Sequence, residues 1–297
     1  MAEATTGPSG AYLAEHDQGR LHSIPGAPIV LETQYPVEKF YRRERGAFAH
    51  ELGLELLADR PLEPEVLEAL RLLWDIERST TGQLRDLFAG WTSKEARIDA
   101  FLTTWAYEKF WIADALKRVL LAHGAPTPSQ VEPDGDLAGL AERALDRIRP
   151  VVEAVTTNLS GERIVAGQMA RCLSRESAAA ALLRRLRDLA AHPVVDRLCD
   201  EALERTEDYI GFFRTEARAR LLADPAAAAP ARSALRGGFS PLRPPRVPRS
   251  GQRRALEVLA PGVPARRALC READAEVHAL PGLRGPEPLA RALSREI

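Results

Sequence analysis

Long stretches in which apolar residues recur every three or four positions constrain the fold of this chain more than any other feature. In one stretch the series is Trp105, Lys109, Ile112, Leu116 and Val119, which puts four apolar side chains and one lysine on a single helical face. Helices are expected over about residues 36–58, 64–89, 93–123, 136–158, 161–191 and 194–223. No strand pattern of consequence accompanies them. The sequence therefore predicts an all-α protein built as an up-down helical bundle.

Proline and glycine mark the limits of the helices and of larger regions. Gly124-Ala125-Pro126 is typical of a helix stop, and Pro225 follows the last long helix. Residues 1–35 are expected to form an irregular arm, residues 36–235 the bundle with an extra N-terminal helix, and residues 236–297 a Pro/Arg-rich strap with two short helices around Pro281-Gly282. Because no aromatic residues alternate with the arginines of the strap, we interpret them as solvated and expect no nucleic-acid site.

Composition and charge argue against several classes of protein. The 297 residues carry a formal net charge of −1, which gives no general attraction to nucleic acid or to anionic membranes. No run of about 18 apolar residues predicts a membrane span, and the N-terminus lacks the cationic start and apolar run of a signal peptide. Three scattered cysteines, Cys172, Cys199 and Cys270, favour reduced thiols. We therefore expect a cytoplasmic protein.

The stretch from Trp105 to Gly124 reads WAYEKFWIADALKRVLLAHG. It resembles the second core helix of the ferritin-like acyl-carrier-protein desaturase family, whose pattern is Trp-x-x-Glu-Glu-x-x-His-Gly followed by a leucine-rich run. The match runs without a gap. Lys109 and Ile112 stand where that family has a metal-binding Glu and His. A lysine cation and a branched alkyl group cannot ligate iron.

The other core helices carry weaker matches to the same family. Glu77 in WDIERSTT and Glu176 in QMARCLSRESAAAALLRRL match the lone glutamates of the first and third core helices. When RTEDYIGFFRTEARARLL is aligned on its Phe-Phe pair, Thr206 and Tyr209 fall at the Glu and His positions of the fourth. The resemblance thus implies a ferritin-like bundle in which four of the six ligand positions are replaced.

The chain also lacks the Glu-x-x-His motif through which such bundles bind di-iron. None of its six histidines has a Glu or Asp three residues before it. This spacing matters because residues three apart point the same way on a helix, so that carboxylate and imidazole converge on one metal. The resemblance, which covers about residues 36–235, therefore implies a fold without its di-iron centre, and we expect no cofactor.

Lys109 is the residue whose environment most needs an explanation. A buried lone ammonium is very unfavourable, so it must pair, deprotonate or meet water. One interpretation is a structural salt bridge with Glu77, Glu176 or both. Another is a lysine that acts as an acid, a base or a Schiff-base nucleophile in a dry pocket. A third is a helix register shifted by one residue, with Glu108 pointing inward instead.

We predict a metal-independent, non-redox enzyme that acts on an apolar small molecule by proton transfer, elimination, isomerisation or cyclisation. The Ala/Arg/Leu-rich, lysine-poor composition fits bacterial specialised metabolism, and the resemblance is compatible with a homodimer. The expected catalytic residues are Lys109, Glu77, Glu176 and Tyr209, and the expected substrate-binding residues are Trp105, Ile112, Cys172 and Thr206. This hypothesis requires a connected cavity that reaches Lys109 and Glu176.

Two alternatives remain open at this stage. In the first, the bundle binds an apolar ligand or a partner subunit without catalysis, these residues are ordinary core residues, and Ile112, Leu116 and Leu183 close the space. In the second, the chain is a di-iron oxidase or desaturase with non-standard ligands. Its carboxylates, Glu77, Glu108, Glu176 and Glu207, would then face one another with Lys109 outside. If the chain holds no metal, Glu204, Glu207 and Asp208 are expected on the solvated side of their helix.

Overall fold

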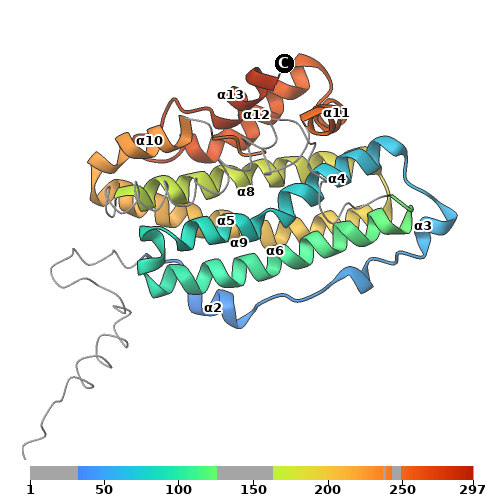
Figure 1. Ribbon diagram of the computed structural model, residues 1–297, viewed down its shortest axis with the longest axis horizontal. Helices are drawn as coiled ribbons and strands as arrows, with labels where there is room; N and C mark the ends of the chain where they lie inside the picture. The colour runs from blue at the N-terminus through green and yellow to red at the C-terminus, as the bar shows by residue number, and fades with distance from the viewer. Residues whose placement is uncertain (1–32, 126–162, 237–238, 243–248, 297) are drawn as a thin grey trace, which may run out of the picture.

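The computed structural model describes residues 33–125, 163–236, 239–242 and 249–296, whose regular structure is helical (Figure 1). No strand occurs within these ranges, which confirms the all-α prediction for them. None of their helices is long and apolar enough to cross a bilayer. The loop predicted at 126–135 and the helix predicted at 136–158 lie outside the described residues, as does most of the predicted N-terminal arm.

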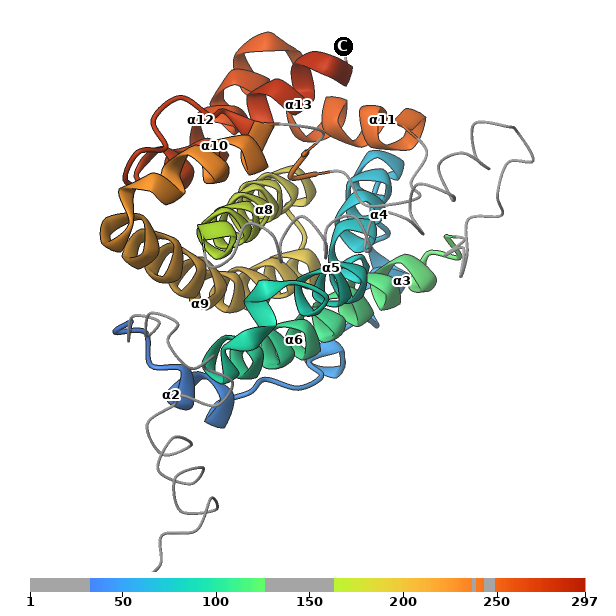
Figure 2. The ribbon, with the colours of Figure 1, turned by 60° about the vertical axis from the view of Figure 1, so that its left-hand side comes forward.

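Four long helices form the centre of the molecule. They are α4 (Pro64–Arg78), α6 (Ala96–Ala122), α8 (Arg163–Ala190) and α9 (Pro193–Ala223). Helix α4 packs against α6 and α8, and α9 packs against α8 and α6, so the four helices surround a common core (Figure 2). The helices predicted in these regions are confirmed. The observed bounds of α6, α8 and α9 agree with the predicted ranges to within a few residues.

The local sequence explains where the long helices begin and end. Pro64 and Pro193 each occupy a first helical turn, where a missing N–H leaves no helical hydrogen bond unmade. The side chain of His192 accepts a hydrogen bond from the backbone N–H of Val194 and so caps α9. Helix α6 ends just before Gly124, whose φ of +61° is the left-handed conformation that glycine favours.

The single helix predicted over residues 64–89 is broken at Ser79. Beyond the break, α5 (Thr80–Phe88) continues the path of α4, and a 3₁₀ turn (Trp91–Lys94) leads to α6. The hydroxyl of Ser79 donates to the carbonyl of Ile76, a local bond that competes with helical pairing. The break shifts the buried face, because Thr80 is buried whereas Thr81 and Phe88, which lie four and eleven residues after Glu77 on the face that an unbroken helix would bury, are exposed.

The prediction of an amphipathic helix over residues 36–58 is wrong. The segment forms α2 (Val37–Arg42), a 3₁₀ turn (Ala49–Glu51) and α3 (Leu56–Asp59), with irregular chain between them. Gly53 has a φ of +70°, which interrupts any helix at that point. Many of its apolar residues are still buried without a continuous helix: Phe40, for example, stacks on Phe101 of α6 with ring centroids 4.5 Å apart, whereas Tyr41 and Leu56 are exposed.

The C-terminal region is more helical than the predicted strap. It contains a 3₁₀ turn (Pro225–Ala227), α10 (Ala228–Arg236), α11 (Arg249–Leu259), α12 (Gly262–His278) and α13 (Pro288–Glu296). Helices α10 and α12 pack along α8, and α11 packs against α4 (Figure 2). Pro281-Gly282 lies between α12 and α13, as predicted. Pro264 and Pro288 lie in the first turns of α12 and α13, where a missing N–H leaves no helical hydrogen bond unmade.

Candidate functional site

Three charged side chains from three helices meet in the core. Lys109 Nζ of α6 lies 2.5 Å from Glu77 Oε2 of α4 and 3.0 Å from Glu176 Oε2 of α8. All three side chains are at most 3% exposed. Each belongs to the apolar stripe of its helix, so the packing that buries its neighbours also turns it inward. We call Glu77, Lys109 and Glu176 the ion cluster.

The two carboxylates of the ion cluster differ in their hydrogen bonds. Glu176 Oε2 accepts from Lys109 Nζ, and Glu176 Oε1 accepts from Trp105 Nε1 at 3.1 Å. Glu77 Oε1 is buried and has no hydrogen-bond partner among the described residues. A buried carboxylate oxygen without a partner is costly in free energy. Glu77 is therefore the member of the cluster with spare capacity to hold a proton or meet a ligand.

Burial and charge act against each other within the ion cluster. Burial raises the pKa of Glu77 to about 7, against the opposing charge of Lys109 and together with the charge of Glu176. Burial lowers the pKa of Lys109, but the two carboxylates outweigh it and its pKa lies above the ordinary value. The two carboxylates thus favour the protonated form of Lys109, which is not nucleophilic. Glu77 is the member of the cluster whose pKa lies near neutrality.

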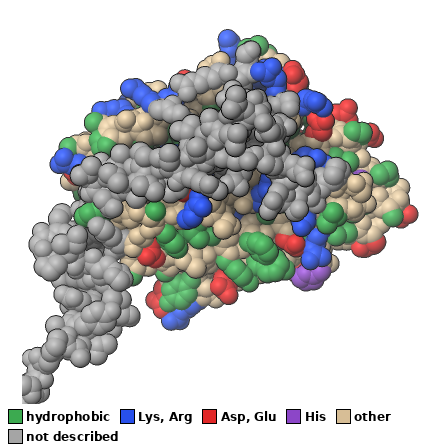
Figure 3. Space-filling view, viewed as in Figure 1, with side chains coloured by type: hydrophobic (Ala, Val, Ile, Leu, Met, Phe, Trp, Pro, Cys, Tyr) green, Lys and Arg blue, Asp and Glu red, His purple; other side chains and the backbone are tan. Residues whose placement is uncertain are grey.

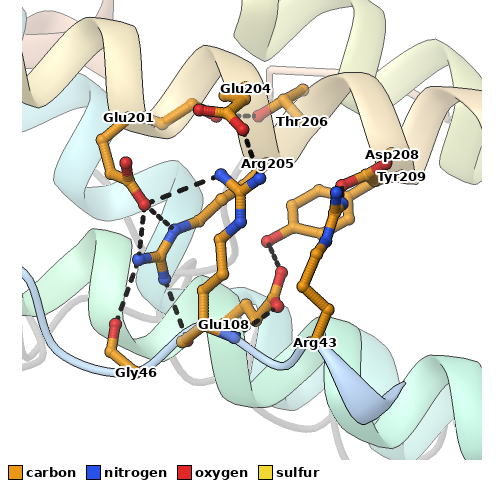
Figure 4. A network of polar contacts seen from close by, with 11 residues as sticks. Arg43, Gly46, Glu108, Glu201, Glu204, Arg205, Thr206, Asp208 and Tyr209 are labelled. Atoms are coloured by element: carbon orange, nitrogen blue, oxygen red, sulfur yellow. Dashed lines mark hydrogen bonds and ion pairs between the residues drawn. The ribbon is translucent and has the colours of Figure 1, made fainter. Parts of the chain in front are cut away.

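Tyr209 lies beside the ion cluster but is bonded elsewhere. Its hydroxyl donates to Glu108 Oε2 at 2.8 Å, while the backbone N–H of Arg45 donates to Glu108 Oε1 at 2.8 Å (Figure 4). The ring of Tyr209 faces Lys109 Nζ at 5.8 Å. The hydroxyl therefore bonds Glu108 rather than a carboxylate of the ion cluster. Burial and the charge of Glu108 raise the pKa of Tyr209 well above its ordinary value.

Both Glu108 and Lys109 are buried, so the alternative of a shifted register does not describe this helix. The two neighbouring residues turn to different sides of the α6 face: Lys109 meets α4 and α8, and Glu108 meets α9 and the segment after α2. The broad buried face of α6 accommodates both, because it packs against neighbours on more than one side.

Arg205 is a buried charged residue that the sequence reasoning missed. It is 2% exposed, pairs with Glu201, and donates to the backbone carbonyls of Arg45 and Gly46 (Figure 4). Its guanidinium also lies over the ring of Phe48, 4.5 Å from the centroid. The sequence contains a pattern that could have identified it. Position 205 lies on the same helical stripe as position 209, and a glutamate four residues earlier can neutralise the arginine.

The other residues predicted to bind substrate make contacts that are ordinary for a helical core. Ile112 is fully buried, and Thr206 Oγ1 donates to the carbonyl of Ala202 at 2.7 Å. Cys172 Sγ accepts from Gln83 Nε2 at 3.2 Å, and burial raises the pKa of its thiol to about 11. Cys172 is therefore a neutral thiol whose contact links α8 to α5.

The geometry differs from the one that a carboxylate metal site requires. Glu207 is exposed, and Lys109 lies between Glu77 and Glu176 rather than outside them. Within the described residues, no group of three His, Cys, Asp or Glu side chains has an arrangement that could hold a metal ion. Of the other carboxylates in that part of α9, Glu204 pairs with Arg45 and Asp208 with Arg43.

Two hollows formed by described residues lie away from the ion cluster. The larger, of about 870 Å³, is an open depression lined by α2, its flanking residues and Arg97 and Ala100 of α6. The smaller is lined by residues of α4 and α11. Neither lining includes a residue of the ion cluster. On two of the helices that form the cluster, α6 and α8, Ile112, Leu116 and Leu183 are fully buried.

Comparison with protein-family models, with curated proteins and with solved structures found no match to this chain.

Proposed function

We propose that the chain is a ferritin-like bundle of the desaturase type in which the ion cluster replaces the di-iron centre. Two observations support this. The helix pairs α4/α6 and α8/α9 follow each other in the chain and are separated by the long stretch between α6 and α8. Residues from three of these helices, at three positions that the resemblance assigns to metal ligands, also meet at one point in the core.

The proposed activity is a metal-independent proton transfer on an apolar small molecule. The observation that carries it is Glu77, a buried carboxylate with one unpartnered oxygen and a pKa raised to about 7. A general base works best when its pKa lies near the working pH. Glu77 is the proposed base. Lys109 and Trp105 stabilise charge beside it, because both are donors already directed at the cluster.

Access to Glu77 requires movement of the packed helices. The chain breaks at Ser79, two residues beyond Glu77, and the short α5 that follows is held to α8 by the contact of Gln83 with Cys172. We propose this short helix as the element that parts from α8 to admit substrate. The apolar surroundings, including Trp105 and Ile112, favour an apolar molecule over a charged one.

A second candidate is a bundle without catalysis that serves as a ligand-binding or partner subunit. It is favoured by a different observation, namely that Ile112, Leu116 and Leu183 have no exposed surface. In that case the ion cluster only fills the volume between the helices, and its charges balance one another without reacting.

Deuterium exchange separates the two candidates. The protein is incubated in D₂O with a panel of apolar ketones and acyl thioesters, and deuterium at carbon is measured by mass spectrometry. The enzyme proposal expects incorporation that the Glu77→Gln variant loses and that Glu207→Gln, an exposed control on α9, retains. Incorporation that persists in folded Glu77→Gln contradicts the role of Glu77. No incorporation in the wild type would favour the second candidate, and a ligand-induced rise in melting temperature would then indicate ligand binding without catalysis.

A further inference from the structure

Two histidines at one end of the bundle accept hydrogen bonds from the backbone. His123 directly follows α6, and His192 lies in the turn between α8 and α9, at the end of the molecule near α3 (Figure 1). The backbone N–H of Leu62 donates to His123 Nε2 at 2.9 Å, and that of Val194 donates to His192 Nδ1 at 3.2 Å. An imidazole nitrogen accepts a hydrogen bond only while it lacks a proton, so both contacts require a neutral ring.

The two neutral rings carry their protons on opposite nitrogens. Because His123 Nε2 accepts, its proton is on Nδ1, which donates to the carbonyl of Val119 at 2.9 Å. Because His192 Nδ1 accepts, its proton is on Nε2, which is buried and has no hydrogen-bond partner among the described residues. His192 as a whole is only 2% exposed. The surrounding chain therefore fixes each histidine in one neutral tautomer.

The chain between the first 3₁₀ turn and α4 depends on contacts at this end. We call residues 52–62 the entry segment. Its one helix, α3, has four residues, so contacts with other elements hold most of it in place. Arg197 of α9 donates to the first carbonyl of the segment at 2.7 Å, and Arg60 donates to the carbonyl of Ala191 at 3.2 Å. The entry segment is thus attached to α6 through His123 and to the α8–α9 turn through Arg60.

The surroundings of His192 oppose its protonation. Burial is the main cause that lowers its pKa below the ordinary 6.5, and the positive charges of Arg60 and of protonated His123 act in the same direction. The backbone of Arg60 and the carboxylate of Asp196 act in the opposite direction and are outweighed. The N-terminus of α9 also disfavours a cation at this position. A protonated His192 would therefore repel Arg60, which attaches the entry segment to this turn.

We propose that His123 and His192 form an acid-sensitive latch that holds the entry segment in place when neutral and releases it when protonated. Protonation of His123, which the C-terminus of α6 favours, turns the acceptor of the Leu62 N–H into a second donor, so the segment must move away. Protonation of His192 removes the cap of α9 and repels Arg60. The latch is a regulatory device and is independent of the chemistry proposed for the ion cluster.

The latch has an effect on stability opposite in sign to that of Glu77. Because the pKa of His192 is lowered in the fold, the closed end of the bundle loses stability as the pH drops below 6.5. The raised pKa of Glu77 instead stabilises the fold as the pH drops from about 7. A loss of protection in acid that is confined to the end of the bundle is therefore specific to the latch.

Hydrogen–deuterium exchange at about pH 8 and about pH 5, corrected for intrinsic exchange rates, tests the latch. The entry segment is expected to lose protection by roughly tenfold or more in acid, while the centre of α8 does not. The double variant His123→Gln, His192→Asn is expected to lose this response, because both new side chains can accept the same N–H groups and neither titrates.

The control for this experiment is an exposed histidine. Histidine side chains are few among the residues coloured in Figure 3, and that of His50 is 71% exposed. His50→Gln is expected to keep the full acid response. Unchanged protection of the entry segment in the wild type, or an acid response that persists in the double variant, overturns the proposal.

Nuclear magnetic resonance of the histidine rings in the wild type tests the latch without any substitution. Long-range proton–nitrogen correlations at high pH are expected to show opposite tautomers, with the proton on Nδ1 of His123 and on Nε2 of His192. His192 is expected to titrate below 6.5. The same tautomer in both rings, or a His192 that titrates at or above 6.5, contradicts the latch.

Discussion

At the residue scale, the core contains one ammonium group placed between two carboxylates. Removing Lys109 leaves two buried carboxyl groups without their counterion, whereas replacing all three residues by apolar ones leaves an apolar core. Lys109→Met is therefore expected to lower the free energy of unfolding by about 3–5 kcal/mol. The triple variant Glu77→Leu, Lys109→Met, Glu176→Leu is expected to recover most of this loss. Urea denaturation measures both, and a Lys109→Met variant as stable as the wild type would show that the cluster is not buried as described.

The raised pKa of Glu77 predicts a dependence of stability on pH. Its ordinary value is 4.5 and its value in the fold is about 7. Between these limits the folded state holds a proton that the unfolded state has lost, so the free energy of unfolding falls as pH rises and levels off above 7. Denaturation of the wild type and of Glu77→Gln across this range isolates the effect. Parallel curves for the two proteins would contradict the raised pKa.

Single residues of the ion cluster could be found in the sequence because polar residues on an apolar stripe stand out. Glu77, Lys109 and Glu176 each occupy such a position, and the structure brings them together. Arg205 was missed, although Glu201 lies four residues earlier, because the carbonyls that accept its other hydrogen bonds belong to residues 45 and 46, which lie far from it in the chain. Periodicity describes one helix at a time and contains no information about irregular segments that cross it.

At the element scale, two glycines are expected to respond to alanine in opposite directions. Gly53 has a φ of +70°, and a Cβ there would lie 2.6 Å from Arg197 Nη1. Gly53→Ala is therefore expected to cost at least about 1 kcal/mol. Gly82 lies inside α5 with nothing within 4 Å of an added Cβ, so Gly82→Ala is expected to stabilise by about 0.5–1 kcal/mol. Thermal melts of both variants test the pair, and a loss of stability in Gly82→Ala would contradict the α5 assignment.

The elements that the sequence predicted well are those whose ends carry local signals. Pro64, Pro193 and Gly124 limit their helices through their own backbone preferences. The break at Ser79 and the unwound segment at 36–58 were not predicted, because apolar periodicity continues through both. Tertiary packing of the apolar side chains there outweighs the helical pattern, which is a weak preference over short lengths.

At the scale of the whole molecule, the C-terminal helices are part of the core. Leu269 of α12 is fully buried, on the helix that packs along α8, whereas Val263 of the same helix is 57% exposed. Leu269→Asp is expected to lower the free energy of unfolding by roughly 3 kcal/mol or more. Val263→Asp, near the N-terminus of α12, is expected to stay within about 0.5 kcal/mol of the wild type. Equal stability of the two variants would mean that α12 does not cover α8.

The position of the ion cluster also has a consequence for the order of folding. The hairpin of α8 and α9 joins helices adjacent in the chain, so its contacts are local and are expected to form early. The ion cluster needs α4, α6 and α8 together, and its charges lose their water only when those helices close. The ion pairs of Lys109 are then expected to form after the transition state of folding. Substitutions at Lys109 should therefore alter the rate of unfolding far more than the rate of folding.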